Sequence, residues 1–422
     1  MFLSLAVILL GGLGAGALFK RLRLPSIVGM LLVGVLAGPC ALGLLDESIL
    51  AISADLRKIA LVIILLKAGL SLNLADLKRV GRPAALMSCV PAACEIAGYV
   101  LAAPLFLGVS RVEAAVMGAV LAAVSPAVVV PRMVRLMEEG YGTDKSIPQL
   151  VLAGASCDDI FVIVLFTSFL GMAQGEGVRA AGRASAANRA SAAGRASAAG
   201  LLDIPMSIAL GVIAGALCGA LLAALFTAAY NRGRYIRNSA KLIIILGTAF
   251  LLLSAEELLE PYVAFSGLLA VVSMACVIKL RCPECVTQRL SQKSGKLWIA
   301  AEAVLFVLVG AAVDVRYMAG AGLSAAALIL TALLFRSAGV LLCLIKTPLS
   351  ARERLFCVLA YLPKATVQAA IGSVPLAAGL ACGNTVLTVA VLGIVITAPL
   401  GAFLIDFTYK RLLKRTPRKE QT

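Results

Sequence analysis

The chain has 422 residues, of which 61% are hydrophobic and only 14% are charged. Apolar runs of about 18 residues or more recur along it, which excludes an ordinary soluble protein and predicts an all-α polytopic membrane protein. The net charge of +16 lies in short loops and near the C-terminal end. This distribution is typical of topogenic charge, so we expect membrane lipid and not nucleic acid around the protein.

Thirteen membrane spans are predicted in chain order. The first run has no basic segment before it and is followed by KRLR, so we expect a retained span and not a cleaved signal. By the positive-inside rule the N-terminus lies outside and the C-terminus is cytoplasmic, in the plasma (inner) membrane. The predicted spans are residues 2–19, 26–44, 57–73, 83–107, 113–137, 148–173, 204–229, 239–258, 262–280, 297–315, 321–345, 353–379 and 385–409.

The two halves of the chain resemble each other. Glu95 in the fourth span and Arg336 in the eleventh are lone charges well inside their spans. A similar distance after each comes an interrupted span, AAVSPAVVVPRM in the first half and YLPKATVQAAIGSVPL in the second. The order of spans gives the halves opposite orientations. Inverted repeats with broken helices indicate a transporter whose site lies near the middle of the membrane.

Proline interrupts the fifth span at Ser125-Pro126 and again at Pro131. Proline removes a backbone donor and clashes with the carbonyl four residues earlier. The freed carbonyls of residues 122–125, together with the Ser125 hydroxyl, could then bind a hard cation. The alternative is a plain proline kink, which membrane helices tolerate.

Two adjacent acids, Asp158 and Asp159, lie in the sixth span. One charge at mid-membrane costs about 2.5–3.5 kcal/mol on insertion scales, and each carboxylate opposes ionisation of the other. A bound Na⁺ or Li⁺ favours the ionised form, whereas a proton neutralises it. Competition between cation and proton for one oxygen-lined site, with alternating access, is sufficient for antiport. The alternative is a soluble helix N-terminus with Asp158 as its cap.

Three further residues could balance these acids. Glu95 and Arg336 are each costly alone, so a mutual ion pair is expected, although Arg336 could pair with Asp158 instead. Lys364 lies at the second break, just before Thr366. It could neutralise helix-end dipoles or an aspartate, or extend to the membrane interface.

Histidine is absent, and there are eleven cysteines. Without histidine, neither histidine metal ligation nor a histidine pH switch is possible, so carboxylates or lysine must carry protons. The single CxxC spacing, Cys282 and Cys285, has no second pair, so we expect an inert role for it and no cofactor.

The motifs AVSPAVVVP, GASCDDI and LPKATVQAAIG, in this order, resemble those of the monovalent cation:proton antiporter superfamily. The likeness is greatest to the branch of the animal sodium/hydrogen exchanger-like NHA proteins and their bacterial relatives. It implies a fold of thirteen or fourteen helices in which two broken helices cross, usually a homodimer, and an elevator-like movement.

By position in this resemblance, Asp159 looks like the essential cation and proton carboxylate. Asp158 looks like the extra acid of electrogenic members, and Ser125 falls where many relatives have Thr-Asp. Arg336 falls where well-studied electrogenic members have lysine. Because arginine does not readily release a proton, electrogenic and electroneutral exchange both stay open.

The predicted function is therefore Na⁺(Li⁺)/H⁺ exchange by a secondary active transporter, which is not an enzyme. A K⁺/H⁺ exchanger of the same fold is the alternative, and an organic-anion symporter or a non-transporting membrane sensor is less favoured. The predicted regions are dimerisation helices in 1–82, core helices in 83–174, a low-complexity extracytoplasmic linker in 175–203, a linker helix and dimerisation helices in 204–320, core helices in 321–410, and a basic cytoplasmic tail in 411–422.

Overall fold

The computed structural model describes residues 1–22, 24–71, 80–184, 199–231, 236–259, 265–313 and 315–415. These residues are almost all helical, and the only β-type pairing among them is an isolated bridge between Tyr141 and Arg415. Nine helices in the described ranges are long and apolar enough to cross a membrane. The all-α polytopic fold is thus confirmed, whereas the count of thirteen spans stays a prediction.

The chain divides into two compact units. The first comprises Met1–Arg57, Asn73–Val162 and Ala303–Thr422, and the second comprises Lys58–Leu72 and Ile163–Glu302. All the predicted site residues lie in the first unit. The division falls inside three helices, α5 (Ser53–Ser71), α11 (Ile147–Ala184) and α16 (Glu284–Ala311).

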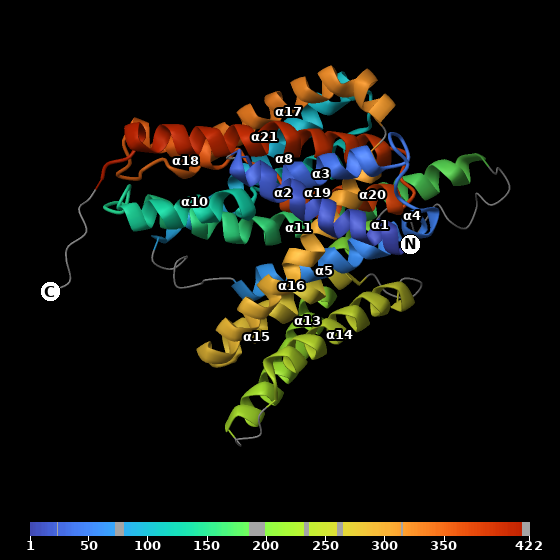
Figure 1. Cartoon of the computed structure of the whole chain (residues 1–422), viewed down its shortest axis with the longest axis horizontal. Helices are drawn as coiled ribbons and strands as arrows, with labels where there is room; N and C mark the ends of the chain where they lie inside the picture. The colour runs from blue at the N-terminus through green and yellow to red at the C-terminus, as the bar shows by residue number, and fades with distance from the viewer. Residues whose placement is uncertain are drawn as a thin grey trace. The chain divides into compact units, whose positions relative to one another are not determined.

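The first unit holds the remaining helices of the N-terminal segment and of both predicted core regions (Figure 1). They are α1 (Phe2–Ala6), the π-helical turn η1 (Val7–Gly11), α2 (Gly12–Arg21), α3 (Ser26–Ala37), α4 (Glu47–Ala51), α7 (Arg82–Met87), α8 (Val90–Leu107), α9 (Arg111–Ala122), α10 (Pro126–Glu139), α17 (Val315–Cys343), α18 (Ala351–Ala360), α19 (Thr366–Gly372), α20 (Val374–Ala377) and α21 (Gly383–Leu412).

Helices α8 and α17 pack closely along each other (Figure 1). A Cβ atom on Gly339 of α17 would lie 2.8 Å from the backbone of Pro91 in α8. Small residues at such contacts let two membrane helices approach closely. This approach brings Arg336, one turn before Gly339, toward Glu95, one turn after Pro91.

The two broken helices begin alike. Ser110 and Glu113 form a capping box at the start of α9, and Ser350 and Glu353 form one at the start of α18. In each box the two side chains accept hydrogen bonds from each other's backbone N–H groups, which satisfies donors that the first helical turn leaves free. The boxes add a second correspondence between the two halves of the chain.

Both predicted breaks are present, at Ser125-Pro126 and around Pro363, but a further interruption expected at Pro131 is not. Helix α10 begins at Pro126, whose fixed φ suits a first helical turn, and α19 begins at Thr366. The prediction that Pro131 also interrupts its span was wrong, because α10 continues through it to Glu139. One proline removes a single helical hydrogen bond, and a membrane helix tolerates this when its neighbours cover the site.

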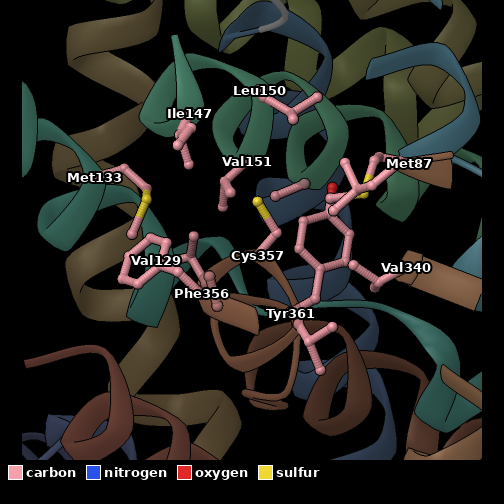
Figure 2. Packing of buried hydrophobic residues seen from close by; sticks show 14 of the residues in the cluster. Met87, Val129, Met133, Ile147, Leu150, Val151, Val340, Phe356, Cys357 and Tyr361 are labelled. Atoms are coloured by element: carbon pink, nitrogen blue, oxygen red, sulfur yellow. The ribbon is translucent and has the colours of Figure 1, made fainter. Parts of the chain in front are cut away.

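A hydrophobic cluster packs α11 against the second broken helix (Figure 2). The ring of Tyr361 lies inside it, and a Cβ on Gly154 of α11 would overlap the Tyr361 hydroxyl oxygen. Glycine is therefore needed at this position, which lies one turn before Asp158 in α11. The labelled members are Met87, Val129, Met133, Ile147, Leu150, Val151, Val340, Phe356, Cys357 and Tyr361.

Helix α11 extends beyond the predicted end of its span at residue 173 and reaches Ala184. The added residues are the alanine-containing start of the predicted linker, and alanine has the highest helix propensity. Residues 185–198 of that linker and residues 416–422 of the predicted tail lie outside the described residues, whereas residues 199–203 of the linker form the start of α13 (Ala199–Asn231).

The second unit contains α13 (Ala199–Asn231), α14 (Asn238–Leu259) and α15 (Gly267–Arg281). Gly211, Gly215 and Gly219 recur at every fourth position of α13, the spacing of close helix packing in membranes. A Cβ on Gly215 would overlap the carbonyl oxygen of Ala270 in α15. Backbone contact between α13 and α15 thus requires glycine at this position.

We expect Gly215→Ala to lower the free energy of unfolding by about 1–3 kcal/mol, because the added methyl forces α13 away from α15. Thermal unfolding in detergent measures this as a lower midpoint. The matched control is Gly247→Ala in α14, where no atom lies within 4 Å of the new Cβ. Equal shifts in the two variants would contradict the packing argument.

Candidate functional site

The two helix breaks contact each other directly. The backbone N–H of Ser125, at the first break, donates to the carbonyl of Pro363, at the second, over 2.8 Å. Ala123 and Ser125 have extended backbone, with ψ of 142° and 109°. Buried backbone without helical partners must be satisfied by other groups. The residues around the breaks are therefore a place where polar side chains are required.

Arg336 of α17 donates to carbonyls at both breaks. Its Nε donates to the carbonyl of Tyr361 over 2.6 Å, and its Nη1 donates to the carbonyl of Ala122. These carbonyls belong to the C-terminal ends of α18 and α9, where helices carry partial negative charge and unpaired acceptors. One fully buried guanidinium thus caps two half-helices.

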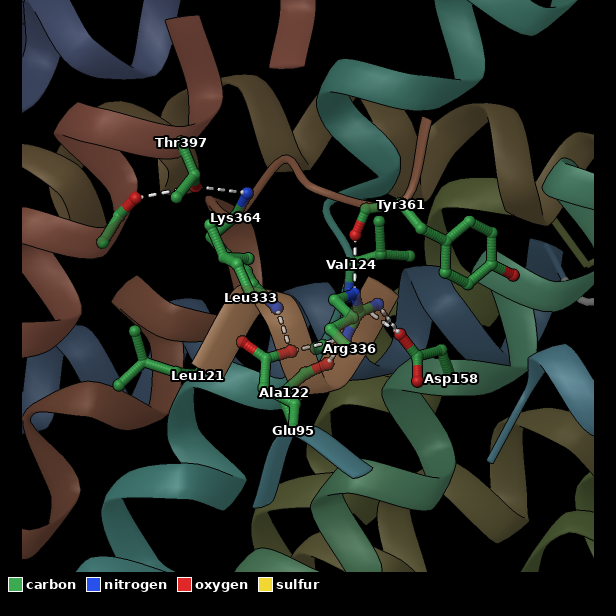
Figure 3. Close-up of polar contacts among 12 residues, drawn as sticks. Glu95, Leu121, Ala122, Val124, Asp158, Leu333, Arg336, Tyr361, Lys364 and Thr397 are labelled. Carbon is green, nitrogen blue, oxygen red and sulfur yellow. Dashed lines mark hydrogen bonds and ion pairs between the residues drawn. The ribbon is translucent and has the colours of Figure 1, made fainter. Parts of the chain in front are cut away.

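The same arginine belongs to a buried ion network (Figure 3). Its Nη1 lies 2.7 Å from Oε2 of Glu95, and its Nη2 lies 3.2 Å from Oδ2 of Asp158. The Nζ of Lys364 lies 2.5 Å from the same Glu95 oxygen, and the Lys364 backbone N–H donates to the Thr397 hydroxyl over 2.9 Å. Lys364 therefore pairs with Glu95, whereas Arg336 is the cation bound to Asp158.

Helix α11 places both aspartates in the interior. Oδ2 of Asp158 accepts a second hydrogen bond, from the Val124 N–H over 2.8 Å, which ties α11 to the first break. Asp159 is only 7% exposed and forms no ion pair with any residue that the structure describes. Among the buried side-chain oxygens without a hydrogen-bond partner are Oγ of Ser125, Oδ1 of Asp158 and Oδ1 of Asp159.

The charges of this cluster do not sum to zero. Glu95 and Asp158 are two negative charges, and Arg336 and Lys364 are two positive charges, so these four balance. Asp159 is a further acid in the same buried region. An unpaired buried charge is strongly unfavourable, so Asp159 needs either a proton or a bound cation.

Gln368 of α19 also connects the breaks. It is not among the site residues predicted from the sequence. Its Nε2 donates to the carbonyls of Leu121 and Ala123, over 3.3 and 2.8 Å. Its Oε1 accepts from the Ala365 N–H over 2.7 Å. Its position in the sequence could have indicated this role, because Gln368 is the third residue of a helix that follows a break, and glutamine at the third position is typical of helix capping.

These contacts correct one expectation. The carbonyls of residues 122–125 were expected to be free for a cation, but Arg336 binds that of Ala122 and Gln368 binds that of Ala123. The Ser125 carbonyl accepts from the N–H groups of Val128 and Val129 in α10, so three of these four carbonyls are engaged. A hard cation at this site would therefore meet carboxylate and hydroxyl oxygens.

Comparison with known proteins identifies relatives over nearly the whole chain. Residues 5–411 match the family model described as "Sodium/hydrogen exchanger, transmembrane". The chain is 31% identical to the Xenopus tropicalis protein named sodium/hydrogen exchanger 9B2, over 100% of this chain and 76% of that protein. It is 30% identical to the human protein of that name, over 94% of this chain and 71% of that protein.

The fold is similar to that of a solved structure, the sodium proton antiporter MjNhaP1 from Methanocaldococcus jannaschii at pH 8. The TM-score is 0.77, and 97% of each chain is covered at 20% sequence identity. At this identity the likeness concerns the fold alone.

Proposed function

This chain belongs to the sodium/hydrogen exchanger family of the monovalent cation:proton antiporter superfamily, and we propose that it exchanges Na⁺ or Li⁺ for H⁺ at Asp159. Proteins of this family are multi-pass membrane transporters, not enzymes, and need no cofactor. The observation that carries the proposal is the surplus acid. Asp159 lies beside a closed network of two acids and two cations, so it is the group free to alternate between a proton and a cation.

Three oxygens form the proposed cation site: Oγ of Ser125, Oδ1 of Asp158 and Oδ1 of Asp159. Each is buried and without a hydrogen-bond partner, and oxygen-only ligation suits a hard monovalent cation. Asp158 keeps Arg336 as a counter-charge that does not release its proton. Asp158 therefore stays ionised as a fixed ligand, while Asp159 changes its occupant.

The alternatives receive less support. The relatives are named sodium/hydrogen exchangers, which favours Na⁺ over K⁺, and a potassium arm in the transport assay tests the choice. A paired-acid site inside a network of matched charges also gives an organic anion no net positive pocket.

We further propose a homodimer in the plasma membrane, with the N-terminus outside and the C-terminus cytoplasmic. The proposal rests on the family resemblance and on the placement of basic loop residues. In an elevator cycle, the core regions 83–174 and 321–410 carry the ion, and 1–82 and 204–320 form the dimer. Native mass spectrometry in detergent tests the dimer, and a monomer alone would contradict it.

Because one carboxylate holds either ion, we expect Na⁺ and H⁺ to compete. As the pH falls through the range in which Asp159 takes up a proton, the apparent KM for Na⁺ rises by up to about tenfold per pH unit. The sign follows from mass action, since protons occupy the site that Na⁺ needs. Proteoliposomes with an internal pH dye, a fixed total of Na⁺ and choline, and several starting pH values measure it.

Two outcomes of that assay would contradict the proposal at different points. A KM for Na⁺ that does not change with pH would exclude a shared site. Absence of any Na⁺- or Li⁺-dependent proton movement would exclude the exchange itself, and K⁺ as the only active cation would reassign the substrate.

A further inference from the structure

Gln368 binds two backbone carbonyls just before Val124 and Ser125, the segment that supplies part of the proposed cation site. We infer that Gln368 is a specificity-determining residue, which holds the carbonyls of α9 away from the cation and thereby favours Na⁺ and Li⁺ over K⁺. The inference rests on the proposed exchange at Asp159 and assigns a cause to its selectivity.

The contacts of Gln368 use its amide fully. The side chain is completely buried; its nitrogen donates to the carbonyls of Leu121 and Ala123, and its oxygen accepts from the Ala365 N–H. A glutamine amide has two N–H donors and one carbonyl acceptor, so both donors and the acceptor are engaged. The side chain is thus held in one orientation by groups on both broken helices.

The carbonyls that it holds belong to the segment that supplies the site. Val124, directly after Ala123, donates its N–H to Asp158 over 2.8 Å, and Ser125, the next residue, contributes an unpartnered hydroxyl. Arg336 takes the carbonyl of Ala122 between the two that Gln368 holds. Three successive carbonyls, those of residues 121–123, are therefore engaged by two side chains and are not available to the cation.

Ligand number and type decide which monovalent cation such a site prefers. Potassium filters replace the hydration shell of the ion with many backbone carbonyls, and the number and field strength of these oxygens contribute to selectivity. A few oxygens, two of them on carboxylates, give a strong field that favours a smaller cation. Release of two carbonyls beside the site adds weak-field ligands, which a larger cation can use.

The test is Gln368→Met, which keeps the length of the side chain but removes its donors and acceptor. We expect the variant to retain Na⁺-dependent proton movement and to gain K⁺ affinity. The ratio of the apparent KM for K⁺ to that for Na⁺ should fall by about tenfold, which corresponds to roughly 1.4 kcal/mol. The assay uses purified full-length protein in liposomes with Na⁺, Li⁺ or K⁺ added at constant ionic strength.

The matched control is Gln149→Met in α11, because the Gln149 side-chain oxygen has no hydrogen-bond partner. Its cation ratio should stay that of the parent protein. If Gln368→Met does not transport, its thermal midpoint in detergent with each cation gives the same ratio of affinities without transport.

An unchanged ratio of K⁺ to Na⁺ affinity in Gln368→Met, in transport or in cation-dependent stabilisation, would overturn the inference. An equal loss of affinity for all three cations, which a purely structural role predicts, is one such outcome. Failure of the proposed function is distinguishable, since the parent protein would then show no cation-dependent proton movement at all.

Discussion

We expect the Asp159→Asn variant to lose all cation-dependent proton movement, down to the level of liposomes without protein. Asparagine has nearly the shape of aspartate, but its amide neither takes up the exchanged proton nor supplies negative charge to a cation. The four-residue network of Glu95, Asp158, Arg336 and Lys364 keeps its own balance. The variant should therefore fold normally and fail only in exchange.

The measurement is the proteoliposome assay together with thermal unfolding of the same preparation. Asp406→Asn in α21 is the matched control. Asp406 has its own partner, Arg132, at 3.1 Å, and its side chain is 40% exposed, where such pairs contribute little. Full activity in Asp159→Asn would remove this residue from the mechanism and the proposed site with it.

The second large effect concerns stability. We expect Arg336→Met to lower the free energy of unfolding by about 3–5 kcal/mol, because it leaves buried charges without their partner. Asp158 would lose its only described cation, and the carbonyls of Ala122 and Tyr361 would lose their donor. Thermal unfolding in detergent should show a clearly lower midpoint.

Two further variants separate charge from packing in that result. Arg135→Met removes the exposed pair between Arg135 and Glu139 in α10, and we expect a change of at most about 0.5 kcal/mol. In the double variant Arg336→Met with Asp158→Asn, the unpaired carboxylate is gone, so part of the stability should return. A parent-like midpoint for Arg336→Met alone would show that the ion network contributes little.

The charges that matter could be found from the sequence. Glu95, Asp158, Asp159 and Arg336 lie deep inside apolar runs, and the energetic cost of such charges in a membrane marks them whatever their partners. The first break could be placed at Pro126 for a similar reason, since proline at that position suits a helix start and not a helix interior.

The pairing within the cluster could not be predicted in the same way. Lys364 lies inside the second break, where no periodicity tells which way a side chain points, and it binds Glu95, although Asp158 had been a candidate partner. The effect of Pro131 could not be predicted either, because residue type alone does not tell whether neighbouring helices will cover one lost hydrogen bond.

Gln368 shows a further limit. A glutamine in an apolar helix is an ordinary polar residue when the sequence is considered alone. Its role depends on Leu121 and Ala123, which lie far from it along the chain and meet it only where the two breaks come together. At the same meeting, Arg336 and Gln368 bind the carbonyls of Ala122 and Ala123, two of those that the sequence alone made available to a cation.

The balanced network has a thermodynamic consequence. Since Glu95, Asp158, Arg336 and Lys364 already cancel, the site is neutral with either Na⁺ or a proton on Asp159, provided that Asp159 is the one group that changes its occupant. An elementary charge crossing the membrane gains or loses about 2.3 kcal/mol per 100 mV, but over a full cycle of one-for-one exchange this contribution vanishes. The voltage of a cell would then neither drive nor oppose the exchange. Sodium would be expelled only until its concentration ratio across the membrane equalled that of protons.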